Sequence, residues 1–459
     1  MPAHPIDFLI QANTFSTPEL LAVFDEKTRF RRWLQFEAAL AATQGELGII
    51  PREAALEIEK KSSLEQLDLA AVAESYKKSR NSVLPVIKEL RAACQGTAGE
   101  YVHYGATTQD VLDTGQALEL KDATQIIYRD LRQLEQNLLI MAEQHKSTPM
   151  IGRTHGQQAL PITFGFKAAI WISEIRRHIE RLKTIFPRII IGQLSGAVGT
   201  MAALGPQAQE TARKTMTRLG LNYSAIAWHT ARDNMAETAG LFAMIATSLE
   251  KFANEIFELG KTEIGELREP APQSAMSSST MPHKRNPVIC QRISVLARHV
   301  RALNGVVLEA MVHEHERDAR ALWAESLALP QISVYTGTAV HYINQVVTGL
   351  EINPERMLQN LYLHKEMAVS EWLMFKLAQH IGRTKAQSLV HKLSNQTYVS
   401  GQSLKELLLE DQETASLLSA KDMDFLDHPE KYTGQAINLT DQMIAATRQK
   451  RNNDPELLK

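Results

Sequence analysis

The sequence QALELKDATQIIYRDLRQLEQNLLIMAEQHKST occupies residues 116–148 and contains neither glycine nor proline. Its apolar residues recur at intervals of three or four positions: Leu120, Ala123, Ile127, Leu131, Leu134, Leu138 and Met141. In an α-helix this spacing brings the apolar side chains onto one face, where they can pack against other helices. The segment therefore predicts an α-helix of many turns.

Three further segments show the same periodicity: residues 164–186, 235–259 and 288–311. Helices of this length, separated by short polar loops, are typical of a helix bundle. Strand signals are few, and the short apolar run at residues 188–191 predicts one strand that pairs with a single other segment at most. We therefore predict an all-α fold with a long central helix bundle.

Turn-forming residues divide the chain into three predicted helical domains. The N-terminal helical domain comprises residues 1–110, the central long-helix bundle residues 111–360, and the C-terminal helical domain residues 361–459. Shorter helices are expected in the two outer domains, because breaks such as Pro51 interrupt the apolar pattern there. The polar tail from residue 448 onward is expected to fray.

Composition narrows the class of protein. Hydrophobic residues make up 44% and charged residues 22% of the 459 residues, as in an ordinary soluble globular protein. A formal net charge of -2 gives no electrostatic basis for binding nucleic acid or an anionic membrane. Two cysteines, Cys94 and Cys290, exclude a disulfide framework and a thiolate metal site. No apolar run reaches the roughly 18 residues of a membrane span, so we expect a cytoplasmic protein with neither membrane nor nucleic-acid partners.

A polar loop at residues 277–287, with the sequence SSSTMPHKRNP, contains four consecutive hydroxyl-bearing residues. Because apolar periodicity resumes after Pro287, we expect this proline to open a helix whose first backbone amides are free. The helix end, Lys284 and Asn286 would together form an anion-binding corner for a carboxylate substrate, with a serine placed to move a proton. A mobile linker is the alternative interpretation of the serines alone.

Two other polar clusters fall between the predicted helices. Residues 103–110, HYGATTQD, precede the first long helix, and N-capping by Thr108 or Asp110 is the alternative to a binding role. Residues 152–158, GRTHGQQ, lie between two long helices. Histidine is a residue type suited to acid–base chemistry, and the glycine that follows His155 permits close approach to a ligand, although an ordinary surface histidine would fit the same pattern.

The loop at residues 277–287 resembles the signature loop of the fumarase/aspartase superfamily, and the two other clusters match the family's remaining blocks in order and spacing. Residues 195–200 and 314–318 extend the resemblance, which spans the chain from about residue 15 to beyond residue 360. It implies β-elimination from a succinyl-type polycarboxylate, usually with release of fumarate, through a dianionic intermediate that needs electrostatic stabilisation. It also implies a homotetramer with active sites shared between chains, and no cofactor or metal.

The resemblance assigns roles to individual residues. Ser278 would be the catalytic base and His155 the catalytic acid or its partner. The substrate contacts that it implies are His103, Thr107, Thr108, Thr154, Gln157, Lys284, Asn286 and Arg317. Ser277 stands where the family loop normally has glycine.

Two branches of the superfamily compete, adenylosuccinate lyase and 3-carboxy-cis,cis-muconate cycloisomerase. His155 favours the first branch, but Asn81 occupies the place of its second catalytic histidine. Thr14, Phe15 and Ser326 stand where that branch holds a nucleotide phosphate. We therefore predict a compact polycarboxylate or N-succinyl amino compound as substrate, with cleavage of a carbon–nitrogen bond favoured. A cycloisomerase and a non-enzymatic helical scaffold are the alternatives.

Overall fold

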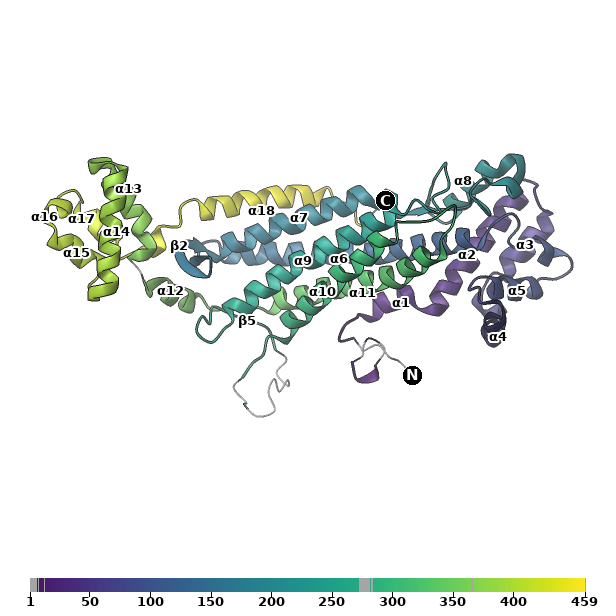
Figure 1. Ribbon diagram of the computed structural model, residues 1–459, viewed down its shortest axis with the longest axis horizontal. Coiled ribbons are helices and arrows are strands. Elements are labelled where there is room, and N and C mark those ends of the chain that lie inside the picture. Colours follow the sequence, from purple (N-terminus) through teal and green to yellow (C-terminus); the bar gives the residue numbers. More distant parts are fainter. Residues whose placement is uncertain are drawn as a thin grey trace.

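The computed structural model describes residue 6 and residues 8–11, 13–271, 281, 284–364 and 366–458. Over these residues the molecule is elongated, and its long helices run side by side through the middle (Figure 1). Strands are short and few, so the predicted all-α class is confirmed.

The central bundle consists of the four helices that the apolar periodicity predicts, together with one further long helix that was not predicted and one helix from the end of the chain. The bundle helices are α6 (Thr108–Gln144), α7 (Phe164–Ile189), α9 (Asp233–Leu259), α10 (Val288–Glu309), α11 (Ala319–Gly349) and α18 (Ala436–Asn452). Helix α6 begins at Thr108, eight positions before the segment that the sequence marks as free of glycine and proline.

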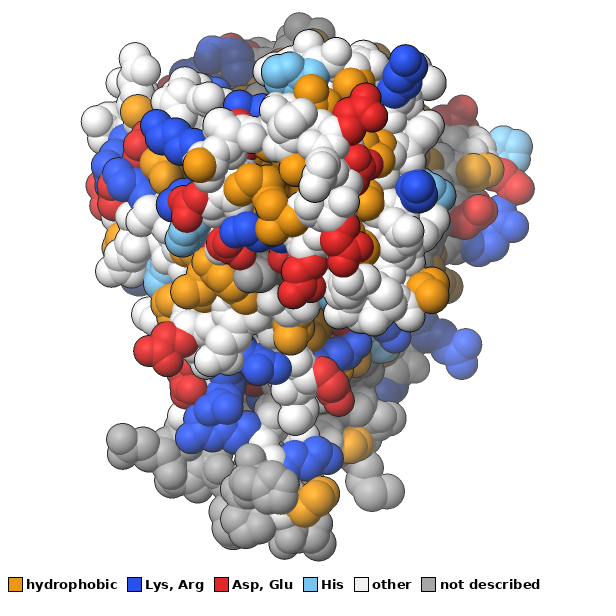
Figure 2. Space-filling model, turned by 90° about the vertical axis from the view of Figure 1, so that its left-hand side faces the viewer, with side chains coloured by type: hydrophobic (Ala, Val, Ile, Leu, Met, Phe, Trp, Pro, Cys, Tyr) orange, Lys and Arg blue, Asp and Glu red, His pale blue; other side chains and the backbone are white. Residues whose placement is uncertain are grey.

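Shorter helices lie beyond the two ends of the bundle. Before it the chain forms α1 (Pro18–Phe24), α2 (Glu26–Glu46), α3 (Arg52–Lys61), α4 (Leu69–Ser79) and α5 (Leu84–Ala93), and α8 (Ala208–Arg218) packs against α2. After it come α12 (Pro354–Tyr362), α13 (Ser370–Ile381), α14 (Arg383–Ser400), α15 (Leu404–Glu410), α16 (Gln412–Ala415) and α17 (Ala420–Phe425). Figure 2 shows the end face formed by this last group, where hydrophobic side chains gather between charged ones.

Three small two-stranded sheets join the helices. β1 (Pro149–Thr154) and β2 (Gln157–Thr163) form an antiparallel hairpin, β3 (Ile191–Gly192) pairs in parallel with β4 (Asn222–Tyr223), and β5 (Leu267–Arg268) pairs antiparallel with β6 (Glu351–Ile352). The strand predicted at residues 188–191 overlaps β3 only at Ile191, because α7 extends to Ile189, and β3 pairs with one other segment. The remaining elements are 3₁₀ turns at Leu9–Gln11, Leu64–Gln66, Ala98–Tyr101, Ala202–Gln207, Met367–Val369 and Pro429–Lys431.

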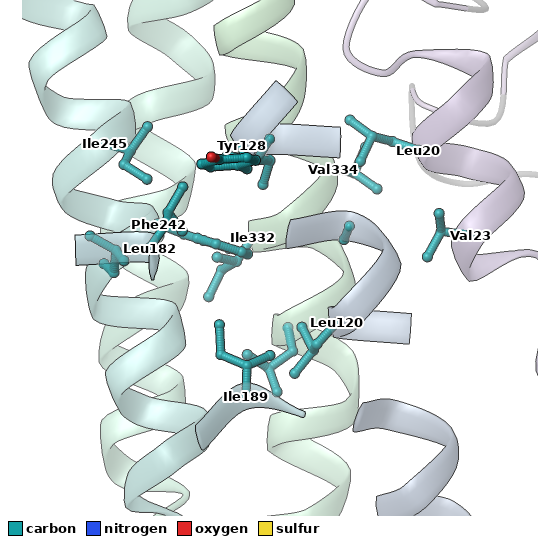
Figure 3. Close-up of a cluster of buried hydrophobic side chains, with 14 of the residues drawn as sticks. Leu20, Val23, Leu120, Tyr128, Leu182, Ile189, Phe242, Ile245, Ile332 and Val334 are labelled. Carbon is teal, nitrogen blue, oxygen red and sulfur yellow. The ribbon is translucent and has the colours of Figure 1, made fainter. Parts of the chain in front are cut away.

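The main hydrophobic core runs along the bundle. Phe242 of α9 and Ile332 of α11 point toward each other beside Leu182 of α7, and Tyr128 of α6 lies above them (Figure 3). These side chains are fully buried, and burial of each contributes about 1.5–3 kcal/mol to folding. A separate core joins α13, α14 and α15, while α18 packs against α7 and α6. The three-domain division given above stays a prediction.

The C-terminal tail is held in place, so the prediction that it frays is wrong. The side chain of Asp454 is fully buried and accepts hydrogen bonds from Arg176 at 2.7 Å and from Lys183 at 2.9 Å. The hydroxyl of Tyr128 donates to the carbonyl of Pro455 at 2.7 Å. The polar tail adds a buried carboxylate to two cations of α7, Arg176 and Lys183, which also pair with Glu135 and Glu180.

Candidate active site

Most of the sequence-predicted site residues lie in two groups at opposite ends of α6, and Lys284 and Asn286 lie apart from both along the chain, before α10. Thr107 and Thr108 stand at its first turn, and the hairpin with His155 follows its last turn. A helix of 37 residues extends for roughly 55 Å at about 1.5 Å per residue. One chain therefore does not bring these two groups together. We call them the helix-start cluster and the hairpin cluster.

The helix-start cluster, which comprises His103, Thr107, Thr108 and Arg317, is organised by Asp110. This carboxylate is fully buried. It accepts the backbone N–H groups of Thr107 at 3.0 Å, Ser195 at 2.9 Å and Gly196 at 3.0 Å. The Nε2 atom of His229 donates to its Oδ1 atom over 3.1 Å. Asp110 therefore ties the start of α6 to the loop at residues 195–199.

Arg317 is fixed against the same loop. Its Nε atom donates to Oε1 of Gln109 at 2.8 Å, and its Nη2 atom donates to the carbonyl of Ala197 at 2.8 Å and to Oγ1 of Thr107 at 3.4 Å. Among the described residues Nη1 has no hydrogen-bond partner that would occupy it. A guanidinium held in this way on one side can present its other nitrogen to a carboxylate.

His103 and Thr108 contact residues of the N-terminal helices. The Nδ1 atom of His103 lies 2.7 Å from Oε1 of buried Glu37. Burial opposes protonation of His103, but the attraction of Glu37 outweighs it, so the pKa of the imidazole is raised. The hydroxyl of Thr108 accepts from Nδ2 of Asn81 at 3.4 Å. Asn81, which stands where the adenylosuccinate lyase branch has its second catalytic histidine, thus lies at the helix-start cluster.

The hairpin cluster comprises Thr154, His155 and Gln157, all of them exposed. His155 and Gly156 both have positive φ, 53° and 76°, as a two-residue hairpin turn of the primed type requires. The prediction of a plain loop between two helices is therefore wrong here, because Thr154 pairs with Gln157 in a ladder. Arg153 anchors the hairpin by donating to the carboxylate of Glu266 at 2.9 and 2.7 Å.

Lys284 and Asn286 lie just before α10, and Ser278 lies outside the described residues. The expectation of free amides at the start of α10 is wrong. The carboxylate of Glu269 accepts the N–H groups of Ile289 at 2.9 Å and of Cys290 at 2.7 Å. A carboxylate is the natural ligand of a helix N-terminus, and here the protein supplies its own.

A pocket of about 270 Å³ opens beside Gln109 and the helix-start cluster. We call it the Trp323 pocket. At its base Arg232 donates to Asp113 at 3.0 Å and to Glu325 at 2.9 Å, and Gln116 donates to Glu325 at 2.6 Å. Burial raises the pKa of the Asp113 carboxyl to about 6, although Arg232 opposes this.

Sequence reasoning missed the supporting residues of this region, chiefly Gln109, Asp113 and Arg232. One signal was present, since Gln109 and Asp113 are polar residues one helical turn apart on the side of α6 that is otherwise apolar. Among the described residues no group of three or more histidine, cysteine or acidic side chains could hold a metal ion. Nor does any helix among them have the length and apolarity to cross a membrane.

The comparisons with known proteins agree with this fold. A family model described as Lyase matches residues 12–302, and one described as Adenylosuccinate lyase C-terminus matches residues 366–443. The chain is 39% identical over 444 residues to the N-acetyl-S-(2-succino)cysteine lyase of Dickeya dadantii, covering 97% of this chain and 98% of the relative. It is 37% identical over 454 residues to the adenylosuccinate lyase of Methanocaldococcus jannaschii, covering 98% and 97%.

A solved structure has the same architecture. The crystal structure of 3-carboxy-cis,cis-muconate lactonizing enzyme from Pseudomonas putida matches with a TM-score of 0.88 at 34% identity, covering 95% of this chain and 98% of that chain. The fold and the relatives define an all-α lyase. The chain belongs to the fumarase/aspartase superfamily, whose enzymes act on small polycarboxylate substrates.

Proposed function

We propose that this protein eliminates fumarate from a compact N-succinyl or S-succinyl amino compound. The observation that carries the proposal is the helix-start cluster, where Arg317 is fixed by three hydrogen bonds beside Thr107. Such a corner can hold the carboxylates of a succinyl group and stabilise the dianionic intermediate. Cleavage of a carbon–nitrogen bond is favoured, and carbon–sulfur cleavage is included because a relative of 39% identity is a succinocysteine lyase.

The proposed roles follow the family pattern. Ser278 removes the proton next to a substrate carboxylate, and His155 protonates the departing atom. Lys284 and Asn286 hold a carboxylate from the side of α10, and the remaining contacts come from Thr107, Thr108, His103, Arg317, Thr154 and Gln157. His155 supports this assignment because its turn exposes the imidazole at the tip of an anchored hairpin.

The site is proposed to be shared between chains of a homotetramer. The length of α6 supports this, since its two ends carry residues that the chemistry needs in one place. Large apolar side chains on the outer faces of the bundle support it as well. They are Ile170, Met244, Val295, Val306, Leu308 and Leu327, each between 39% and 69% exposed. Such an area is normally covered by another subunit.

A nucleotide is disfavoured as the leaving group. The hydroxyl of Tyr342 donates to the carbonyls of Asn13 and Thr14, which fixes this segment beside the far part of α11. Ser326 lies 16 positions earlier on that helix, or roughly 24 Å away. The two segments would meet only between different chains of the proposed tetramer, and neither offers a cation for a phosphate.

A turnover assay tests the proposal. The purified protein is incubated with N-succinyl and S-succinyl amino compounds, and fumarate is followed by its ultraviolet absorbance. We expect fumarate release, with Ser278→Ala abolishing turnover while folding and substrate binding persist. The proposal fails if no succinyl compound releases fumarate.

Subunit mixing tests the shared site. His155→Ala and Arg317→Ala are each expected to be inactive alone. Mixed tetramers should regain activity, up to roughly a quarter of the wild-type value if each site draws the two residues from different chains. An active monomer in sedimentation would refute this part.

A cycloisomerase is the second candidate, favoured by the TM-score of 0.88 to the muconate lactonizing enzyme. Consumption of 3-carboxy-cis,cis-muconate without fumarate formation would establish it in place of the lyase.

A further inference from the structure

The Trp323 pocket lies directly behind the corner that would hold the succinyl carboxylates. Gln109 belongs to both, because its Oε1 atom accepts from Arg317 and its side chain also lines the pocket. Helices α2, α6 and α11 supply most of the remaining walls. A substrate whose carboxylates contact Arg317 would place its other half in or near this pocket.

The charges of the pocket are already paired with one another. Arg232 binds Asp113 and Glu325, and the exposed fractions of the three side chains are only 1%, 3% and 2%. Arg29 donates to both oxygens of Glu119 at 2.8 and 2.9 Å. The pocket thus contains three carboxylates and two guanidinium groups, and both guanidinium groups are engaged. A phosphate dianion would meet an excess of negative charge and no available cation.

Flat apolar surface makes up the rest of the wall. Trp33 is buried against the start of α6, whereas Trp323 is 66% exposed at the rim. Leu112, Leu322 and Ser326 also line the pocket, and the hydroxyl of Ser326 donates to the carbonyl of Trp323 at 2.9 Å. Indole faces favour stacking with aromatic rings and with planar amides.

We propose that the Trp323 pocket binds the leaving half of the substrate and selects an amino compound that presents an aromatic ring or an acyl amide and carries no phosphate. This inference rests on the proposed elimination reaction, and it names the class of leaving group. Trp323 and Ser326 are then residues that determine specificity.

Binding of leaving-group probes tests the pocket independently of turnover. The probes are N-acetylphenylalanine amide, which is uncharged and carries an aromatic ring and two amide groups, and AMP, which carries a phosphate. Calorimetric titration into the full-length protein should give binding of the amide at least tenfold tighter than that of AMP. Trp323→Ala should weaken binding of the amide about tenfold. Tyr398→Ala, a matched loss of an exposed aromatic side chain on α14 outside the pocket, should leave it unchanged.

A variant that gains AMP binding provides the second test of the pocket. Ser326→Arg places an unpaired guanidinium at the pocket and should strengthen AMP binding about tenfold. The inhibition constant of fumarate, which reports only the carboxylate corner, should stay unchanged in Trp323→Ala. Equal binding of AMP and the amide by the wild-type protein would overturn the inference, as would a Trp323→Ala variant with unaltered amide affinity. Failure of every succinyl compound to release fumarate would remove the proposed reaction, while the probe titrations would still decide whether the pocket selects against phosphate.

Discussion

The Asp110 carboxylate is the contact on which the geometry of the helix-start cluster depends, and Asp110→Asn should disrupt it. Each oxygen accepts two donors: Oδ1 takes those of Ser195 and His229, and Oδ2 takes those of Thr107 and Gly196. An asparagine keeps one oxygen and turns an NH₂ group toward the other two donors. Two buried donors then lose their partner at about 1–3 kcal/mol each, so we expect a loss of roughly 4 kcal/mol.

Guanidinium chloride unfolding at fixed chain concentration, followed by circular dichroism and tryptophan fluorescence, measures this loss. The control is Asp25→Asn. Asp25 caps α2 by accepting the N–H groups of Lys27 and Thr28, but it is exposed. Asparagine caps a helix as well as aspartate does, so its effect should be close to zero. If Asp110→Asn cost less than about 1 kcal/mol, the assignment of four buried donors to this carboxylate would be wrong.

Other substitutions test contacts elsewhere in the chain. The pKa of His103 is raised in the folded state. Its pairing with Glu37 therefore stabilises the fold fully below about pH 6.5, and this stabilisation is lost as the pH rises through the folded pKa. In denaturant titrations, Glu37→Gln should destabilise the protein more at about pH 5.5 than at about pH 9. Glu269→Gln removes the charge at the start of α10 and should speed hydrogen exchange of the Ile289 amide, whereas unchanged exchange would show that this cap is dispensable. Asp454→Ala removes one of the carboxylates that pair with Arg176 and Lys183, which keep Glu135 and Glu180 as partners. The lost charge-assisted hydrogen bonds should cost about 1.5–3 kcal/mol in unfolding free energy, and a stability equal to that of the wild type would restore the frayed tail.

The long helices could be predicted because their signal is local. A stripe of apolar residues at helical spacing needs no knowledge of the partner that will cover it. The first residue of α6 was harder to predict, because Gly115 immediately precedes the segment that is free of glycine and proline. In the structure this glycine lies within the helix, and a Cβ atom there would stand 3.0 Å from Cδ1 of Trp33. The glycine therefore permits a close approach of two helices, which the sequence alone does not distinguish from a break.

The supporting contacts of the site could not be predicted, because they join distant parts of the chain. Asp110 bonds to Ser195 and His229 across 85 and 119 positions. Its N-capping role was recognisable as an alternative, but its three long-range donors were not. The hairpin around His155 was missed for a different reason. Its strands contain glycine and proline, which interrupt a strand pattern, and the positive φ of His155 itself depends on the paired strands on either side.

Helix α6 fixes the distance between the helix-start cluster and the hairpin cluster, so the proposed activity should depend on assembly of the chains. A rigid helix of 37 residues cannot fold back on itself without breaking many consecutive backbone hydrogen bonds. Loop movement at either end covers far less than the roughly 55 Å length of α6, which separates the segments of Thr107 and His155. If both residues act on one substrate, chain association is a condition of catalysis in the proposed assembly. On dilution, activity should then fall together with the fraction of tetramer. The fall should be steeper than in proportion to the chain concentration.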